Sequence, residues 1–365
     1  MAELVLPDYG GPCITNIVPA LLGPPDEAPP WLPAGVLDAS QVVLLVVDGL
    51  GWEQLESRRA LVPTIAAMDG TPITTVAPST TATALTSLTT GLPPGRHGII
   101  GYRMAVHGEV LNVLRWSTGS GDARQSIPPS KLQPTPPFLG ERPPVVTRAE
   151  YRQSGFTGAH LDPARYWGYR TLATMVTEVD RLVRSSEPFV YAYYDGLDKV
   201  AHEYGLGEHY DAELAWIDHT IERILAALPR GGALVVTADH GQVDVGGNVV
   251  PLAPDVQGLV AMQSGEGRFR WLHARSGRAG ALAEAAAAHH GDDAWVLTRD
   301  RMVDDGWFGP VVTEAAASRL GDVALVARRP VAFHDPRDTG PYELVGRHGA
   351  CTSAEMLVPL LTTSH

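Results

Sequence analysis

Residues 41–52, "QVVLLVVDGLGW", indicate the fold most directly. Six consecutive apolar residues at 42–47 precede Asp48, and a glycine-rich turn follows. An unbroken apolar run is typical of a central parallel strand that is covered on both faces. An aspartate at the end of such a strand is often only a turn residue. It can also be a functional group, because open α/β sheets bind ligands beyond the carboxyl ends of their strands.

Two further apolar runs have the same character, "PFVYAYY" at 188–194 and "GALVVT" at 232–237. Helical patterns over residues 170–185 and 211–228 precede them, and the second pattern places Leu214, Ile217 and Ile221 on one face. Strands that alternate with helices predict an α/β fold with a mostly parallel central sheet flanked by helices.

Two regions depart from this alternation. Residues 103–162 are rich in proline and show little periodicity, so we expect an irregular insertion or lid. Over residues 248–342 short strand patterns and an alanine-rich helix restart, which predicts a small inserted α+β module. The segment "TSAEMLVPLL" at 352–361 predicts a closing helix. We therefore expect a single catalytic domain over residues 1–365 that carries both insertions.

Composition limits the partners. The chain is 44% hydrophobic with a net charge of −13, which suits a globular protein and argues against a nucleic acid polymer as partner. No apolar segment approaches the roughly 20 residues of a membrane span, so no membrane partner is expected. The N-terminus lacks the pattern of a secretory signal. The two cysteines, Cys13 and Cys351, favour a reducing compartment, and we expect a cytoplasmic protein of undetermined oligomeric state.

Acidic and imidazole residues follow each of the three strong strand patterns. Asp198 and His202 are four residues apart after the second strand, so a helix there would place both on one face. His348 lies between glycines near the end of the chain. Carboxylate and imidazole groups suit zinc or a related divalent ion. The candidate ligands are Asp48, Asp198, His202, Asp239, His240 and His348.

Residues 74–99, "TTVAPSTTATALTSLTTGLPPGRHGI", are crowded with hydroxyl groups and lead from a proline turn into a predicted helix. A threonine at the N-terminal end of that helix would hold its oxygen beside free backbone N–H groups, which attract anions. Ser79, Thr80 and Thr81 are also ordinary capping residues. Capping, however, requires only one of them.

These motifs occur along the chain in the order typical of the alkaline phosphatase superfamily. The chain resembles this superfamily, and most closely its type I phosphodiesterase/nucleotide pyrophosphatase branch. The resemblance rests on Asp-Gly at 48–49, a hydroxyl residue before "TGL…HGI", D-x-x-x-H at 198–202, D-H-G at 239–241 and H-G at 348–349. It covers residues 41–245 and the segment around His348, but neither insertion. It implies an alkaline-phosphatase-like core.

The resemblance also implies roles for these residues. Asp198, His202 and His348 correspond to the ligands of one metal ion, and a second set binds the other: Asp48, Asp239 and His240. The family's nucleophile lies nine residues before the threonine of "TG", which is Thr81 here, with Thr80 as the alternative. The implied cofactors are two divalent ions, zinc first and manganese or another ion second.

The activity that the resemblance implies is hydrolysis of phosphate diester or pyrophosphate bonds in small, nucleotide-type phosphate esters, through a phospho-threonine intermediate. The branch usually has an asparagine shortly after "HGI", where this chain has Tyr102 and Arg103, so these two residues are expected to contact the substrate. The aromatic residues expected to line a pocket for the leaving group are Trp116, Phe138, Tyr166 and Trp167.

Other functions differ in what they require. A phosphomonoesterase or phosphonate hydrolase would use nearly the same core, so both stay open, as does a metal- and phosphate-binding module without turnover. A sulfatase needs a cysteine or serine in a C/S-x-P-x-R setting, which is not found at the nucleophile position. A nucleotide-dependent dehydrogenase needs a G-x-G-x-x-G turn after the first strand, and "DGLGWEQL" does not provide one.

Overall fold

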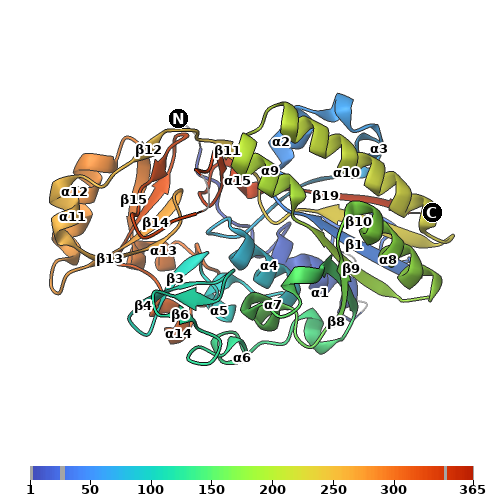
Figure 1. Cartoon of the computed structure of the whole chain (residues 1–365), viewed down its shortest axis with the longest axis horizontal. Coiled ribbons are helices and arrows are strands. Elements are labelled where there is room, and N and C mark those ends of the chain that lie inside the picture. The colour runs from blue at the N-terminus through green and yellow to red at the C-terminus, as the bar shows by residue number, and fades with distance from the viewer. Residues whose placement is uncertain (1–2, 25–28, 341–342, 365) are drawn as a thin grey trace.

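The computed structural model describes residues 3–24, 29–340 and 343–364. Its centre is a seven-stranded sheet in the order β2-β19-β10-β1-β9-β7-β8 (Figure 1). The strands are β2 (Asp69–Thr74), β19 (Leu357–Ser364), β10 (Gly232–Thr237), β1 (Gln41–Val47), β9 (Phe189–Tyr194), β7 (Pro144–Arg148) and β8 (Arg165–Tyr169). From β10 to β8 neighbouring strands are parallel, whereas β19 is antiparallel to both of its neighbours.

Strand β1 is buried along its whole length and pairs in parallel with β9 and β10. This placement explains why all three sequences are apolar without alternation, since helices cover both faces of the sheet. Helices α8 (Leu172–Arg184) and α10 (Glu208–Ala227) lie on one side, and α1 (Ile17–Leu22), α4 (Thr81–Thr90) and α7 (Gly155–His160) on the other (Figure 1). The prediction of an α/β fold with a mostly parallel sheet is confirmed.

Residues 103–162 are more regular than the sequence suggests. They begin with an antiparallel sheet of β3 (Arg103–Val106), β4 (Glu109–Asn112), β5 (Ser117–Thr118) and β6 (Gly121–Asp122). Later in this region, β7 lies inside the central sheet between β9 and β8. The expectation of an irregular insertion over the whole range is therefore wrong. Proline is tolerated at the first residue of a strand, and Pro144 at the start of β7 made the strand look like a loop.

Within residues 248–342 a second sheet has the order β13-β14-β16-β15 (Figure 1, left). Its strands are β13 (Val260–Gly265), β14 (Phe269–Ala274), β15 (Ala294–Thr298) and β16 (Val323–Ala327), and helices α11 (Pro254–Leu259) and α12 (Ala279–His290) accompany it. Two short pairings lie where the chain enters and leaves the module. Outside it, β11 (Val243–Asp244) pairs with β18 (Gly346–Arg347), and just inside it, β12 (Val249–Val250) pairs with β17 (Ala332–Phe333).

The closing helix expected over residues 352–361 is wrong. Only α15 (Ser353–Met356) is helical, and β19 then runs between β10 and β2. A short apolar run such as "LVPLL" fits a buried helix and a buried strand equally well, so periodicity could not separate them. The remaining helices are α2 (Trp52–Glu56), α3 (Pro63–Ala66), α5 (Pro94–His97), α6 (Pro129–Leu132), α9 (Gly196–Tyr204), α13 (Arg299–Asp304) and α14 (Glu314–Ala317).

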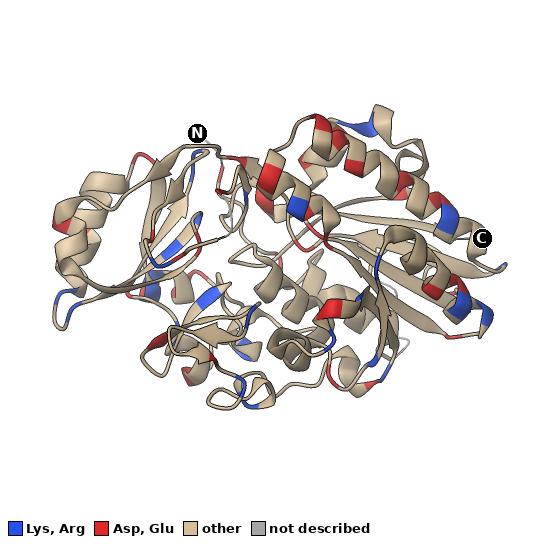
Figure 2. Cartoon of the chain, in the orientation of Figure 1, with Lys and Arg blue, Asp and Glu red and all other residues tan. Residues whose placement is uncertain are grey.

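Asp and Glu outnumber Lys and Arg along α10, which lies at the outer side of the fold (Figure 2). Part of the negative net charge is thus carried at the surface. Among the described residues, none of the helices combines the length and the apolar character needed to cross a membrane.

A buried ion pair ties the inserted module to the main domain. Arg268, which precedes β14, binds both carboxylate oxygens of Glu355 in α15 at 2.7 Å, and both side chains are fully buried. Glu355 also accepts hydrogen bonds from the backbone N–H of Ala350 and the hydroxyl of Thr352. Every oxygen of this carboxylate is therefore satisfied, as a buried charge requires. The pair fixes the segment that follows His348.

We expect Arg268→Met to lower the free energy of unfolding by about 3–5 kcal/mol, because it leaves the Glu355 carboxylate buried without its cation. Urea denaturation of the full chain measures this loss. Arg181→Met is the matched control, since Arg181 forms an exposed pair with Glu178 and should cost less than about 1 kcal/mol. Adding Glu355→Gln to Arg268→Met should recover part of the loss. Equal losses in the two single variants would contradict a structural role for the pair.

Candidate metal centre

The candidate ligands come from the carboxyl ends of three adjacent strands. Asp48 follows β1, Asp239 and His240 follow β10, and Asp198 lies in the first turn of α9, which follows β9. Because β10, β1 and β9 are parallel neighbours, these ends lie at one edge of the sheet. His348 reaches the same edge from the segment after β18. The fold thus joins residues that are as far apart in sequence as 48 and 348.

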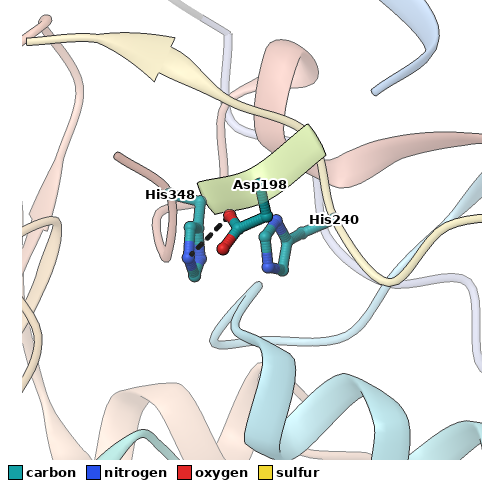
Figure 3. Close-up of side chains that lie close together, drawn as sticks. All are labelled: Asp198, His240 and His348. Atoms are coloured by element: carbon teal, nitrogen blue, oxygen red, sulfur yellow. Dashed lines mark ion pairs between the residues drawn. The ribbon is translucent and has the colours of Figure 1, made fainter. Parts of the chain in front are cut away.

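Two buried clusters result, in each of which the possible ligand atoms lie within 4.8 Å of one another. One consists of Asp48, Asp239 and His240, as the sequence predicts. The other consists of Asp198, His240 and His348, with the Asp198 carboxylate facing both rings (Figure 3). His240 belongs to both clusters, so the two sites adjoin.

The sequence places His202 with Asp198 and His348, and the structure brings it close to both. Its Nε2 lies 3.3 Å from Asp198 Oδ2, and its ring centroid lies 5.1 Å from that of His348. The more compact trio nevertheless contains His240 in place of His202. The D-x-x-x-H spacing still brings its two residues together. Because Asp198 and His202 are four residues apart in helix α9 (Gly196–Tyr204), they lie on the same face.

All three imidazole rings use Nδ1 for a hydrogen bond to the backbone. The Nδ1–H groups of His202, His240 and His348 donate to the backbone carbonyls of Gly346, Gly241 and Ser79 at 2.7, 3.1 and 3.0 Å. Each neutral ring therefore keeps its lone pair on Nε2. Those lone pairs face carboxylate oxygens: His240 Nε2 lies 3.3 Å from Asp48 Oδ1 and 3.5 Å from Asp239 Oδ2. Two acceptors at this distance need a cation or a proton between them.

The carboxylates are held in a similar way, with one oxygen fixed by a protein donor. Tyr193 donates its hydroxyl to Asp48 Oδ2, and Gln242 donates to Asp198 Oδ1 at 2.5 Å. Asp239 Oδ1 accepts two backbone N–H groups, from Gly49 and His240. Asp48 Oδ1 and Asp239 Oδ2 are buried and have no hydrogen-bond donor among the described residues. Fixing one oxygen and leaving the other free is how proteins orient metal ligands.

Sequence reasoning missed Tyr193 and Gln242. The only signal for Gln242 is its place directly after D-H-G, and Tyr193 lies within an apolar strand pattern that predicts only a core residue.

The pKa shifts of these side chains also indicate a metal site. Burial, followed by the charges of Asp239 and Asp198, raises the pKa of Asp48 well above its usual value. Burial also raises the pKa values of Asp198 and Asp239 and lowers that of His240. The protein alone thus disfavours the charged form of every one of these groups. Divalent cations would reverse that balance, and the donor set fits two of them.

A cavity of about 170 Å³ opens beside the clusters. Its wall includes Asp48, Thr81 and Asp198 together with aromatic and apolar side chains. The structure does not place the expected aromatic residues there. Trp116 is in the core, where its indole N–H donates to Ile127, and Phe138 packs against Tyr191. The aromatic residues that do line the cavity are Tyr151, Phe156, Tyr191 and Tyr193.

Tyr102 and Arg103 do not line this cavity either. Arg103 is buried in β3, and its guanidinium lies 2.7 Å from Asp335, so its charge is compensated within the protein. The hydroxyl of Tyr102 accepts a hydrogen bond from Asn112. Neither side chain is thus brought to the metal centre, and the expected contact of these residues with substrate gains no support from this arrangement.

We expect Asp239→Asn to change stability in opposite directions with and without metal. The Asn amide keeps an acceptor for the two backbone N–H groups and adds a donor toward His240 Nε2, so the variant should unfold at a higher temperature than wild type in chelator. In excess zinc the order should reverse, because wild type gains more binding energy. Calorimetric melting and metal analysis measure both effects.

Asp180→Asn is the control for this comparison, since Asp180 pairs with Arg184 on the outer face of α8, away from the metal centre. It should leave the bound-metal count unchanged. A wild-type melting temperature that is the same in chelator and in zinc would contradict a metal centre at this edge.

The fold is shared with several solved structures. Murine ectonucleotide pyrophosphatase/phosphodiesterase 5 matches with a TM-score of 0.67 at 16% identity, over 89% of this chain and 88% of that one. An inactive threonine-to-alanine variant of the murine protein in complex with AMP gives 0.64 at 15% identity, over 88% and 87%. Phosphonoacetate hydrolase from Sinorhizobium meliloti 1021, in complex with phosphonoformate, gives 0.62 at 18% identity, over 90% and 91%. These matches show an alkaline-phosphatase-like fold.

A comparison with curated proteins found no match. The family described as type I phosphodiesterase/nucleotide pyrophosphatase, in contrast, matches residues 42–350. This span begins in β1 and includes Thr81, all six candidate ligands and both insertions. The resemblance deduced from the motifs is thereby confirmed, and the chain belongs to the type I phosphodiesterase/nucleotide pyrophosphatase family of hydrolases.

Proposed function

We propose that the protein hydrolyses phosphate diester or pyrophosphate bonds of small, nucleotide-type substrates, with two divalent metal ions and Thr81 as the nucleophile. The position of Thr81 carries this proposal. Its hydroxyl donates to His240 Nε2 at 3.2 Å, and His240 belongs to both acidic clusters. Thr81 also lines the cavity together with Asp48 and Asp198. One hydroxyl is thus next to both clusters and open to a ligand.

The neighbouring hydroxyl groups support this choice because they have other roles. Ser79 donates its hydroxyl to the carbonyl of Ala350 at 2.6 Å and accepts the N–H of Gly349. Thr80 is the N-cap residue of α4, but its side chain makes no capping hydrogen bond and contacts Glu266 instead. Helix capping therefore does not explain the run of hydroxyl residues. Thr81, the first residue of α4, is the one that faces the cavity.

In the proposed site, Asp198, His202 and His348 hold one ion, and a second set holds the other: Asp48, Asp239 and His240. When bound, such ions lower the pKa of a coordinated hydroxyl and neutralise the charge of a phosphoryl group. Zinc suits this set of carboxylate and imidazole donors, and manganese is the alternative.

The chain's own residues then have separate tasks. Thr81 Oγ1 forms the bond to phosphorus while the bond to the leaving oxygen breaks on the opposite side, which leaves a phospho-threonine. Water hydrolyses this ester and regenerates the hydroxyl. The free N–H groups in the first turn of α4 lie next to Thr81, where they stabilise the negative charge of the transferred group.

Two of the similar structures bear on the substrate. The murine variant that is inactive after a threonine-to-alanine substitution is in complex with AMP, which supports a threonine nucleophile and a nucleotide-type substrate here. Phosphonoacetate hydrolase has a similar fold and is in complex with phosphonoformate. This second match keeps phosphonate hydrolysis as the alternative function.

We expect Thr81→Ala to lower kcat by about a thousandfold or more, because it removes the hydroxyl that contacts His240 and lines the cavity beside Asp48 and Asp198. The bound-metal count should stay at the wild-type value, since no carboxylate or imidazole is removed. Thr80→Ala is the matched control and should lose less than about tenfold. Full activity in Thr81→Ala together with an inactive Thr80→Ala would instead identify Thr80 as the nucleophile.

A substrate panel separates the candidate functions. For the zinc-loaded protein we expect kcat/KM to be at least about tenfold higher for bis(4-nitrophenyl) phosphate than for 4-nitrophenyl phosphate, and chelator to abolish both reactions. Release of inorganic phosphate from phosphonoacetate with neither ester hydrolysed would favour the phosphonate hydrolase. Turnover of none of the three would leave a binding module without catalysis.

A further inference from the structure

The cavity wall contains an unusual residue for this chain. There are only two lysines, Lys131 and Lys199, among 28 Lys and Arg residues, so arginine supplies almost all the positive charge. Lys199 lies in α9 directly after Asp198, and among the residues that line the cavity it is the only Lys or Arg. Lysine differs from arginine as a compact point charge on a flexible stem. A lysine at position 199, in a chain that otherwise uses arginine, therefore indicates a specific role in the cavity.

The ammonium group of Lys199 has a donor to spare. Its Nζ lies 2.6 Å from Asp195 Oδ2 and donates to the hydroxyl oxygen of Tyr151 at 3.0 Å. An ammonium group carries three N–H donors, so the third has no protein partner among the described residues. The side chain is 49% exposed and lines the cavity. A ligand in the cavity can therefore accept this hydrogen bond.

The charge of Lys199 is also only partly compensated. Asp195 shares its carboxylate with Arg148, whose Nε lies 2.5 Å from Oδ1, and it accepts the hydroxyl of Tyr151. Burial raises the pKa of Asp195, but the charge of Lys199 and the hydrogen bonds from Lys199, Tyr151 and Arg148 bring it below its usual value. Lys199 thus shares its carboxylate partner with Arg148, which also lies 4.0 Å from Glu150, and the charge of Lys199 is only partly neutralised at the cavity.

Away from the metal centre, most of the other residues that line the cavity are apolar or neutral. Leu85, Leu114 and Phe156 are apolar. Burial lowers the pKa of His160 to about 4, so this ring is neutral near pH 7. The hydroxyl of Tyr191 is buried and has no hydrogen-bond partner among the described residues. Beyond the metal centre, the cavity therefore offers one partly compensated positive charge and the free hydroxyl of Tyr191 on a largely apolar wall.

We propose that Lys199 is a specificity-determining residue that binds a second anionic group of the substrate, a carboxylate or a further phosphate, apart from the phosphoryl group that reacts. The inference rests on the proposed function and deepens it. The preferred substrates are phosphate or phosphonate compounds that carry another negative charge close to the reacting phosphorus. An uncharged substituent would leave the ammonium group without its partner, and so bind less tightly.

Three phosphonates test this selectivity without turnover in the Thr81→Ala background, which lacks the proposed nucleophile: ethylphosphonate, phosphonoacetate and methylenediphosphonate. The first has a methyl group where the second has a carboxylate and the third a phosphonate. We expect Lys199→Met to weaken binding of phosphonoacetate, methylenediphosphonate or both to the zinc-loaded protein by about tenfold, the loss of one charge-assisted hydrogen bond. Binding of ethylphosphonate should change less than about twofold. Titration calorimetry gives the three constants, and the larger loss shows which anion fits.

Two control variants and a metal analysis accompany this test. Lys131→Met removes the other lysine, which is exposed on α6 outside the cavity, and should leave all three affinities unchanged. Lys199→Arg should retain part of the selectivity because it retains the charge. Metal analysis of each variant is needed because Lys199 adjoins Asp198. A similar loss for all three phosphonates, or no loss for any, overturns the proposal.

The two proposals fail in different ways. If zinc-loaded wild type does not hydrolyse bis(4-nitrophenyl) phosphate but Lys199→Met still loses affinity only for the doubly anionic phosphonates, the catalytic proposal falls and the role of Lys199 stands. If the ester is hydrolysed and selectivity does not depend on Lys199, the catalytic proposal stands and this inference is wrong.

Discussion

The structure depends on how it accommodates three buried carboxylates at one edge of the sheet. Asp48, Asp198 and Asp239 repel one another, and the imidazole rings beside them face them with lone pairs, because the N–H groups point to backbone carbonyls. Without positive charge this arrangement is unfavourable, and proteins do not normally bury such groups unpaired. Two divalent ions would supply positive charge to the unpaired oxygens Asp48 Oδ1 and Asp239 Oδ2 and to the imidazole nitrogens beside them. The parallel strands bring the three carboxylates together at one edge of the sheet, and bound cations would neutralise their repulsion.

Around this centre, hydrogen bonds from other residues hold the candidate ligands in place. Donors such as Tyr193 and Gln242 hold one oxygen of a carboxylate, and backbone carbonyls hold the rings. The inserted module takes part as well. Its Arg268 fixes Glu355 behind His348, while Glu266, whose pKa burial raises to about 8, lies against Thr80. The module therefore supports the site, because it contacts the segment that follows His348 and the start of helix α4.

Overall charge and local charge are separate in this molecule. The net charge of −13 includes acidic positions along α10 at the surface (Figure 2). At the cavity, Lys199 and Arg148 share the single carboxylate of Asp195. Bound cations would add further positive charge only a few residues away, at Asp198. An acidic protein can therefore still present a cavity that attracts an anionic substrate.

The sequence by itself determined the central strands and the groups at their ends. An apolar run and a D-x-x-x-H spacing are local properties, and within a given helix or strand the spacing of residues fixes the face on which each one lies. The tertiary structure alone decided what meets what: that His240 belongs to both clusters, that Gln242 orients Asp198, and that Trp116 is in the core while Phe156 lines the cavity. It also turned residues 357–364 into a strand. These outcomes depend on the order of strands in the sheet and on contacts between distant segments, which short-range patterns do not encode.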